Sequence, residues 1–371
     1  MSIEIALENT PLHECHLESG AKMGAFAGYD MPLYYKLGVL KEHLWTREHA
    51  GLFDVSHMGQ AMIEGPGVWD LIERLTPSSY AKLGEGRTKY TVLTNEQGGI
   101  IDDLMVTKTG ENSAHFVLNA GCKHKDMDWI KAHMSEGQNF TYFGDWALIA
   151  LQGPSAERII KDVLGLDLSG LAYMGLWARE DYKMFISRLG YTGEDGFELS
   201  VPGADAPALW RKLAAHSEVE PIGLAARDSL RLEMAYCLYG HDIDDTTSPI
   251  EADLGWIMGR GDNKGFIGAD TVLKHREQGP ARKRVGIVLT GKGVAREEAE
   301  IRNENDEMIG KLSSGGFSPS LEKAIGMGYV PAAYTAPGTK LLINVRGRNI
   351  EAEVAPMPFL APKTKTAKKA A

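Results

Sequence analysis

Three runs of alternating apolar and polar residues follow one another in the first third of the chain. They span Thr88–Thr94, Ile100–Thr107 and Ala114–Leu118, and segments rich in Asn and Gly separate them. Alternation with a period of two indicates β-strands, and short turn-rich breaks between such runs indicate hairpins. The sequence therefore predicts an antiparallel β-meander, followed by a helix at Lys123–His133.

The rest of the first 280 residues mixes the two periodicities. Leucines at helical spacing predict a helix at residues 37–50, and the next residues, Leu52–Ile63, alternate like a single strand. Together these patterns predict an α+β arrangement with mostly antiparallel pairing. The further predicted elements are helices at Val68–Leu75, Ser155–Leu164, Ala206–Ala214, Leu224–Tyr236 and Ala269–Glu277, and strands at Trp146–Leu151, Tyr182–Leu189 and Phe197–Val201.

The pattern changes near residue 280. From there to Phe359 the chain contains only short strand-like runs split by Gly, Pro and Asn turns. Such a pattern is typical of a small all-β barrel or jelly-roll-like domain. A chain of 371 residues is also too long for one ordinary domain, so two or three domains are expected. The C-terminal strands are predicted at Arg284–Leu289, Lys311–Ser314, Ala324–Val330 and Lys340–Val345.

Two adjacent carboxylates interrupt the apolar strand at residues 100–107. Successive side chains of a strand point to opposite faces, so Ile101, Asp103 and Met105 are expected on one face and Asp102 and Leu104 on the other. A buried carboxylate without partners costs several kcal/mol. Each acid must therefore be solvated, hold the preceding Gly-Gly turn, or face a ligand, and the segment alone leaves these alternatives open.

A glycine-rich segment, Gly190–Gly196, lies between two strand patterns. Its glycine spacing differs from the dinucleotide-binding fingerprint, and a hairpin turn explains it locally. The hairpin does not explain Glu198, an acid between Phe197 and Leu199. If Glu198 faces a pocket, its two oxygens can accept parallel N–H bonds from a planar ligand edge such as that of a pterin.

The helix at residues 224–236 carries Arg227 and Arg231 four residues apart, on one face. Asp228 can pair with Arg231, which is a structural use. In the functional interpretation, Arg227 is left free to bind an anionic or carbonyl-bearing ligand. His57 is interpreted as a histidine of the core, or one that supports site residues, rather than as a catalyst. No Ser/His/Asp or Cys/His group is predicted, because the sequence has no nucleophile elbow.

Composition and charge narrow the class of protein. The chain is 43% hydrophobic and 24% charged, with a net charge of -10, which disfavours general nucleic-acid binding. No run approaches the length of a membrane span, so a cytoplasmic location and no membrane partner are expected. The three cysteines offer neither a disulfide framework nor a metal-ligand spacing, so no metal site is predicted. The lysines of residues 361–371 predict a disordered basic tail.

Ordered motifs along nearly the whole chain resemble the aminomethyltransferase (T-protein) family of the glycine cleavage system. The match runs from residue 11 to about residue 359. It is carried by Gly24-Ala25-Phe26-Ala27-Gly28, Leu52-Phe53-Asp54-Val55-Ser56-His57-Met58, Thr94-Asn95-Glu96-Gln97-Gly98-Gly99-Ile100-Ile101-Asp102-Asp103, Asn119-Ala120-Gly121-Cys122, Ala150-Leu151-Gln152-Gly153-Pro154, Gly190–Gly196, Gly223–Glu233, Leu238-Tyr239-Gly240 and Gly326-Met327-Gly328-Tyr329-Val330.

The resemblance implies an α+β fold of three domains in a cloverleaf-like arrangement around a tetrahydrofolate channel. The first, discontinuous domain would comprise residues 1–53 and 145–245, with a ferredoxin-like domain at 54–144 between them. A helical linker region would follow at 246–282, then the β-barrel domain at 283–360 and the tail at 361–371.

The implied reaction moves the one-carbon unit of an aminomethyl group from the dihydrolipoyl arm of the H-protein to tetrahydrofolate. The products are 5,10-methylenetetrahydrofolate, ammonia and the reduced lipoyl arm. Carried over residue by residue, the catalytic aspartate of the family falls on Asp103. The family's folate-binding and pocket-lining positions fall on Glu198, Arg227, Tyr191, Met58, Tyr90, Tyr239 and Asn119.

The sequence departs from the family pattern after Phe359. Where the family presents an aromatic or Arg side chain that helps to close the folate site, this chain has Leu360-Ala361-Pro362-Lys363. Whether Lys363 takes that place is left open. Two other functions are alternatives: a tetrahydrofolate-dependent demethylase of a methylated small molecule, and a non-catalytic folate-binding module. Asp103 together with Glu198 and Arg227 argues against the non-catalytic module. The demethylase relatives usually diverge in the aspartate segment and at Asp54 to Met58.

Overall fold

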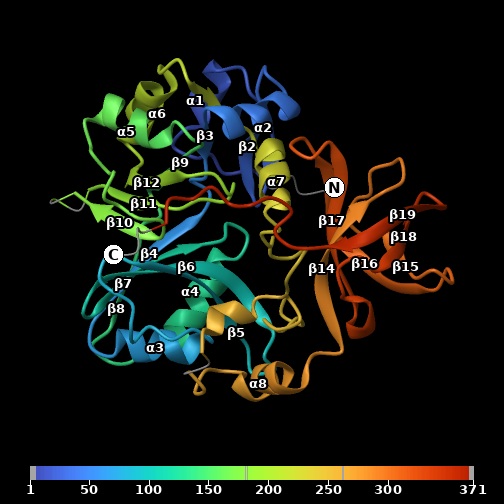
Figure 1. The fold of residues 1–371 in the computed structure, drawn as a ribbon. Coiled ribbons are helices and arrows are strands. Elements are labelled where there is room, and N and C mark those ends of the chain that lie inside the picture. The colour runs from blue at the N-terminus through green and yellow to red at the C-terminus, as the bar shows by residue number, and fades with distance from the viewer. Residues whose placement is uncertain (1–5, 180, 182, 261–262, 367–371) are drawn as a thin grey trace, which may run out of the picture.

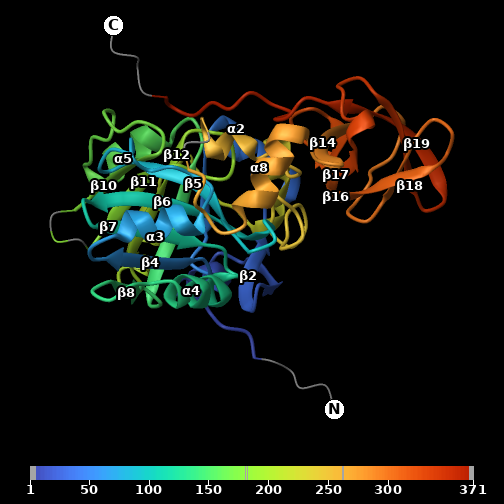
Figure 2. The ribbon, with the colours of Figure 1, turned by 90° about the horizontal axis from the view of Figure 1, so that it is seen from below.

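The structure is a computed structural model that describes residues 6–179, 181, 183–260 and 263–366. Its strands form two open sheets, a closed barrel and a two-stranded hairpin of β1 (Lys22–Phe26) and β2 (Tyr29–Tyr34). In Figures 1 and 2 the barrel lies to one side of the two open sheets. The α+β fold and the C-terminal barrel predicted from the sequence are thereby confirmed.

The six-stranded sheet draws its strands from two separated stretches of the chain. Its order is β10 (Gly175–Ala178), β11 (Phe185–Arg188), β12 (Gly196–Pro202), β9 (Trp146–Gln152), β3 (Ala50–Asp54) and β13 (Val219–Pro221). Only the β3–β13 pair among these strands is parallel. The strand predicted at Tyr182–Leu189 corresponds to β11, and Tyr182 itself lies outside the described residues.

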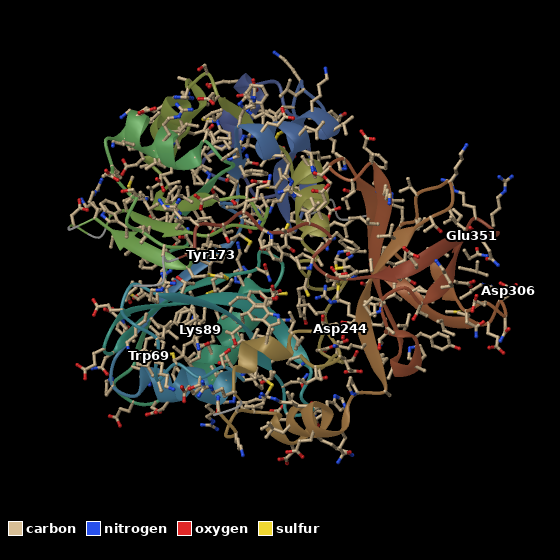
Figure 3. The ribbon with its side chains drawn as sticks, viewed as in Figure 1. Trp69, Lys89, Tyr173, Asp244, Asp306 and Glu351 are labelled. Carbon is tan, nitrogen blue, oxygen red and sulfur yellow. The ribbon has the colours of Figure 1, made fainter. Side chains whose placement is uncertain are left out.

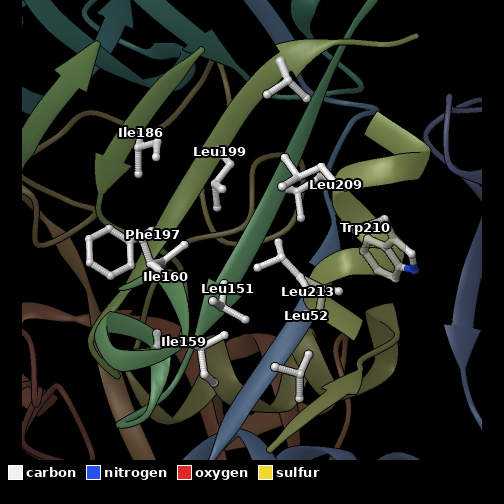
Figure 4. Packing of buried hydrophobic residues seen from close by; sticks show 14 of the residues in the cluster. Leu52, Leu151, Ile159, Ile160, Ile186, Phe197, Leu199, Leu209, Trp210 and Leu213 are labelled. Atoms are coloured by element: carbon white, nitrogen blue, oxygen red, sulfur yellow. The ribbon is translucent and has the colours of Figure 1, made fainter. Parts of the chain in front are cut away.

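Different helices cover the two faces of this sheet. On one face, α1 (His13–Glu18), α5 (Ala156–Leu164) and α6 (Ala206–Ala214) pack against the strands around Trp210 and Phe197, as Figure 4 shows. The opposite face packs against α7 (Leu224–Glu233), through Ala226 and Leu230. The helix α2 (Val39–Glu48) contacts both α7 and β3.

The five-stranded sheet contains the predicted meander. Its order is β5 (Thr88–Thr94), β6 (Ile100–Gly110), β7 (Ser113–Leu118), β4 (Gly59–Glu64) and β8 (Asn139–Tyr142). A hydrophobic core joins it to α3 (Val68–Leu75) and α4 (Lys123–Ala132).

The single strand predicted at Leu52–Ile63 is wrong. The segment forms two strands, β3 and β4, which belong to different sheets. The chain turns after Asp54, whose carboxylate accepts the backbone N–H of Ser56 at 2.9 Å and is also held by Thr10 and His16, at 2.7 and 2.8 Å. An Asp that accepts from the backbone two residues on stabilises a turn, and this turn carries the chain from one sheet to the other.

A bulge also changes the predicted faces of β6. Thr94 pairs with Ile100 but Leu93 pairs with Asp102, so Ile101 is the extra residue. Ile101 therefore packs with the core under α3 and α4, whereas Ile100 packs on the side of Val92. Ile101 does not share the face of Asp103, contrary to strict alternation, but Asp102 and Asp103 do point to opposite faces of the sheet.

The chain from residue 234 to 281 connects the two open sheets to the barrel. It contains the 3-10 helix η1 (Gly255–Met258) and α8 (Ala269–Gln278). Their buried residues pack against Val92 and Ile100 of the five-stranded sheet. The linker is thus fastened to the strand that carries Asp103.

The barrel is closed by six strands around its own core. Their order is β14 (Arg282–Leu289), β17 (Lys323–Pro331), β16 (Met308–Ser318), β15 (Glu300–Arg302), β18 (Lys340–Val345) and β19 (Arg348–Ala355), and the 3-10 helix η2 (Ala332–Tyr334) follows β17. In Figure 3, Asp306 and Glu351 lie at the outer side of the barrel, whereas Tyr173 lies between the two open sheets. The exact domain boundaries stay predictions.

The tail is not disordered over residues 361–366. In Figure 1 it leaves the barrel and runs back across α7 toward the six-stranded sheet. The backbone N–H of Lys363 donates to Gly193 at 2.8 Å, its Nζ lies 3.0 Å from Glu194, and Lys365 binds Glu157 at 2.7 Å. Opposite charges and backbone bonds therefore fasten the segment that was predicted to be free. Residues 367–371 lie outside the described residues.

Within the described ranges, no helix is both long and apolar enough to cross a membrane.

Candidate functional site

Asp103 lies in the middle of β6, on the face that looks toward the linker residues. Its side of the strand is shared by its cross-strand partner Val92 and by Tyr90 of β5. Asp103 is 9% exposed, and the Tyr90 hydroxyl hydrogen-bonds to its carboxylate. Asp103 is therefore nearly buried and held from one side by a phenol.

Asn119, directly after β7, holds Asp103 from the other side. Its side-chain Nδ2 donates to the Asp103 carboxylate at 2.8 Å and lies 2.9 Å from the Asp103 carbonyl oxygen. The same nitrogen lies 3.0 Å from the Asp102 carboxylate. One amide thus bridges two acids that point to opposite faces of the strand, which fixes their relative position.

The electrostatics of this strand keep Asp103 close to half-ionised near neutral pH. Burial, and then the charge of Asp102, raise the pKa of Asp103 to about 7, against hydrogen bonds from Tyr90 and Asn119 that lower it. A carboxyl group with its pKa near neutrality can accept or release a proton under physiological conditions.

Glu198 lies on β12, on the face of the six-stranded sheet covered by α7. Its neighbours Phe197 and Leu199 point to the opposite face, into the core under α5 and α6. Glu198 is 8% exposed, and no group in the described part of the chain hydrogen-bonds to its carboxylate. Burial raises the pKa of Glu198 to about 7, and the charge of Arg227 only partly offsets this effect.

Arg227 projects from α7 on the same side. Its guanidinium stacks over the ring of Tyr191 at 4.7 Å, and burial lowers the pKa of Arg227 against the charge of Glu198. The Nη1 atom is buried and has no hydrogen-bond partner among the described residues. By contrast, Arg231 is fully used, since it binds Asp228 at 2.8 Å and Asp242 at 2.7 Å, and the predicted Asp228–Arg231 pair is confirmed.

Tyr191 lies in the glycine-rich turn between β11 and β12 and contacts Arg227 through its ring. Its ring stacks on Tyr236 with centroids 5.6 Å apart, and its hydroxyl donates to the carbonyl of Cys237. The charges of both Asp103 and Arg227 affect the pKa of Tyr191, which burial raises. The structure therefore brings together Asp103, Tyr90, Tyr191, Arg227 and Glu198 from both open sheets and α7.

Two predicted pocket residues lie at the margins of this cluster. Tyr239 accepts a hydrogen bond from Lys125 at 2.9 Å, with the Lys125 Nζ 4.2 Å from its ring centre. Met58, in the turn after β3, packs against the core between β3 and α7. Neither side chain has a hydrogen bond to the acids among the described residues.

The structure adds three residues that the sequence analysis did not place near the site. Trp256 of η1 is 64% exposed and stacks on Tyr90 with centroids 5.7 Å apart. The Nδ1 of His57 is buried without a partner among the described residues, and burial lowers the pKa of His57 to about 4. Asp126 of α4 lies beside Asp102. Only Asp126 has a signal in the sequence, as an acid on the apolar face of a helix with Met127 and Ile130.

The unsatisfied groups fit a flat polar ligand. Glu198 offers two free acceptor oxygens, and Arg227 offers a free donor, in a site where unpaired polar groups are costly. A ring with adjacent N–H donors and a carbonyl, such as the amino-pyrimidinone of a pterin, satisfies both. Lys363 is not part of this set, because its ammonium is engaged with Glu194.

Comparisons with known proteins agree over nearly the whole chain. The model of the GCVT N-terminal domain matches residues 12–261, and that of the glycine cleavage T-protein C-terminal barrel domain matches residues 282–360. A mitochondrial aminomethyltransferase of Flaveria pringlei is 43% identical, covering 97% of this chain and 91% of that protein. An aminomethyltransferase of Halothermothrix orenii is 40% identical, covering 95% of this chain and 100% of the relative.

A solved structure extends the likeness to three dimensions. The crystal structure of the glycine cleavage system aminomethyltransferase T from Bartonella henselae superposes with a TM-score of 0.93, at 41% identity, covering 97% of this chain and 100% of the other. The chain belongs to the glycine cleavage T-protein family and is an aminomethyltransferase.

Proposed function

We propose that the cluster around Asp103 binds tetrahydrofolate and that Asp103 is the catalytic residue of the aminomethyl transfer. The observation that carries this proposal is the state of Asp103: nearly buried, fixed by Tyr90 and Asn119, and with a pKa of about 7. A structural carboxylate would be satisfied by cations. This one is poised to respond to a ligand.

The reaction moves a one-carbon unit between two carriers. The carbon of an aminomethyl group leaves the sulfur of the dihydrolipoyl arm and becomes bonded to two nitrogens of tetrahydrofolate. The two protons lost from those nitrogens end on the lipoyl thiol and on ammonia, so the step balances without an oxidant or a metal ion. No metal is assigned to the site.

Asp103 has an electrostatic and positional task in this step. A carboxylate at this position orients the folate nitrogen on the aminobenzoyl arm and stabilises the positive charge that develops as the carbon–sulfur bond breaks. The hydrogen bonds from Tyr90 and Asn119 fix the carboxylate before the substrates arrive. No covalent enzyme intermediate is required.

Glu198 and Arg227 are assigned the pterin ring. The Glu198 oxygens accept its paired N–H groups, and the unpartnered Nη1 of Arg227 donates to it. Tyr191, Tyr90, Tyr239, Met58 and Asn119 complete the proposed folate-binding set. In this arrangement the ring ends at Glu198 and the reacting nitrogens lie at Asp103.

The partner that supplies the aminomethyl group is proposed to be the lipoylated H-protein. Support comes from the family match to the glycine cleavage T-protein. A cytoplasmic location is proposed on the acidic, globular composition and on the bacterial relatives, although the plant relatives are mitochondrial. Neither nucleic acid nor membrane enters the proposal.

The decisive experiment compares Asp103→Asn with the wild type. Aminomethylated H-protein and tetrahydrofolate are supplied, and formation of methylenetetrahydrofolate is measured. Loss of the carboxylate removes a transition-state interaction, so turnover is expected to fall by about 100-fold or more, while the Kd for tetrahydrofolate changes by less than about 3-fold.

Asp128→Asn, an exposed aspartate on α4, is the matched control and should retain wild-type turnover. Equal turnover in Asp103→Asn and wild type would remove Asp103 from catalysis. A loss of folate binding that accounts for the whole rate loss would make Asp103 a binding residue instead.

A further inference from the structure

Asp126 is a buried acid whose carboxylate oxygens have no hydrogen-bond donor among the described residues. It lies on α4, is 0% exposed, and shares the buried side of the helix with Met127 and Ile130. An ionised carboxylate in this position would lose its hydration without gaining a hydrogen bond, and the charge of Lys125 offsets only part of that cost, so we expect the group to carry a proton.

In the described part of the chain, the carboxyl of Asp102 lies within hydrogen-bonding reach of Asp126. Two ionised carboxylates cannot hydrogen-bond, but an acid can donate to a carboxylate. Asp102 already accepts from the Asn119 side chain at 3.0 Å, and the Asn119 backbone N–H lies 3.4 Å away. These donors favour the charge on Asp102, and their absence at Asp126 favours the proton there.

We infer that Asp126 is a positioning residue for the transfer reaction: it remains a neutral acid and donates to Asp102, which in turn fixes the Asn119 amide that aims Asp103. This inference rests on the proposed role of Asp103. Asp126 touches no substrate in this scheme and acts through two intermediaries. Its contribution is the geometry and charge state of the residues behind the catalytic carboxylate.

The charges around the chain of contacts agree with this assignment. Burial, and then Asp102, raise the pKa of Asp126 to about 10, and burial raises the pKa of Asp102. The groups that face Asp102 are Asp126, Cys122 and Lys125 from α4 and its N-terminus, Asp103 from β6 and Tyr239 from the segment after α7. Those that face Asp103 are Asp102, Asp126, Tyr90, Tyr191 and Cys237.

Two substitutions at Asp126 distinguish the effect of its hydrogen-bond donor from the effect of its side-chain volume. Asp126→Asn keeps a donor of the same size, so kcat should stay within about 3-fold of wild type. Asp126→Ala removes the donor, and kcat should fall by about 10- to 100-fold with the KM for tetrahydrofolate nearly unchanged, because misplacement of Asp103 affects the reacting geometry. Asp128→Asn on the same helix is the control.

The pH dependence of kcat/KM distinguishes this role from a packing role, because a loss of packing alone would not shift the profile along the pH axis. Without the Asp126 donor, Asp102 takes up a proton more readily and loses the charge that raises the pKa of Asp103. The acid limb of kcat/KM should therefore move to lower pH in Asp126→Ala and stay in place in Asp126→Asn. An Asp126→Asn variant as impaired as Asp126→Ala, or a fully active Asp126→Ala, would overturn the inference.

Infrared spectroscopy tests the proton without reference to activity. The wild-type spectrum at pH 8 should contain the carbonyl band of a protonated, non-exchanging carboxyl group that Asp126→Asn lacks. If the band is absent from wild type, Asp126 is ionised and the inference fails. If the band is present but Asp103→Asn is fully active, the proton assignment stands and the proposed catalytic role of Asp103 fails.

Discussion

Two buried acids in this molecule have opposite surroundings. Glu233, at the end of α7, accepts hydrogen bonds from Arg47 at 2.7 Å and from the Ser320 hydroxyl at 2.8 Å, and His43 lies 3.1 Å away. Burial alone would raise the pKa of Glu233, but His43, Ser318 and Arg47 outweigh it and lower the pKa to about 2. Asp103 is similarly buried, yet its pKa rises to about 7.

The difference lies in the partners rather than in burial. Glu233 is surrounded by Arg47, His43 and serine hydroxyls that leave no oxygen for a ligand, so it fastens α7 to α2 and to the barrel. Asp103 is surrounded by neutral donors and another acid, which makes its ionised form unfavourable. A buried carboxylate in such surroundings indicates a functional role. The fully satisfied acid is therefore interpreted as structural and the poorly satisfied acid as functional.

The largest effect on stability is expected from removing Glu233, the fully satisfied acid. Glu233→Ala leaves the buried Arg47 without one of its two carboxylate partners and His43 without a carboxylate neighbour, so the free energy of unfolding should fall by about 3 to 5 kcal/mol. Because the pKa of Glu233 is lowered in the fold, this loss should be complete above pH 4.5 and shrink as the pH falls toward 2. Chemical denaturation at several pH values measures it. Glu304→Ala, an exposed acid of the barrel, should change stability by less than about 0.5 kcal/mol.

Substitution of Asp103, the poorly satisfied acid, should change the free energy of unfolding in the opposite direction. Asp103→Asn removes a disfavoured buried charge, so the free energy of unfolding should rise by up to about 4 kcal/mol even as activity is lost. The pKa of Asp103 is raised from 3.8 to about 7, so its destabilising contribution is complete above pH 7 and disappears as the pH falls toward 3.8. A variant no more stable than wild type at pH 8 would show that Asp103 is satisfied after all.

Glu198 is expected to be a functional acid like Asp103, and not a structural acid like Glu233. Glu198→Gln replaces one acceptor oxygen with a donor that clashes with the ring N–H groups, so the affinity for tetrahydrofolate should fall by about 10- to 100-fold. Isothermal titration calorimetry with tetrahydrofolate, carried out on Glu198→Gln and on the wild type, measures the difference in affinity. Glu220→Gln on β13 of the same sheet provides the control. Unchanged affinity would place the pterin ring elsewhere.

The smallest effect is expected at Lys363. Its side chain is 62% exposed, and its pair with Glu194 is shared with Arg47 at 3.1 Å. Lys363→Ala should therefore reduce stability by less than about 1 kcal/mol and change the Kd for tetrahydrofolate by less than about 2-fold. A loss of affinity above 10-fold would instead give Lys363 the closing role that the family assigns to another side chain.

Much of the fold could be predicted because local pattern determines it. The bounds of α3, α6, β5 and β18 agree with the sequence prediction residue for residue. The break between β3 and β4 could not be predicted, because it depends on Asp54 meeting Thr10 and His16, partners that are close only in the folded chain. The bulge at Ile101 has the same origin in long-range pairing.

The candidate site divides along similar lines. Asp103 and Glu198 could be predicted as anomalies, since an acid in a strand pattern conflicts with burial, and the family resemblance gave them roles that stay predictions. Trp256 could not be predicted, because its stacking on Tyr90 joins η1 to β5, two elements that lie far apart in the sequence. The ordered part of the tail was missed because Glu194 and Glu157, which bind it, lie far away in sequence.

The fastening of the tail joins the barrel to the six-stranded sheet by a second route, besides the chain that leads from α7 into β14. Lys363 and Lys365, which follow the barrel in the sequence, bind the glycine-rich turn that carries Tyr191 and the helix α5. Any movement of the barrel away from that sheet would therefore have to stretch the tail or break these ion pairs.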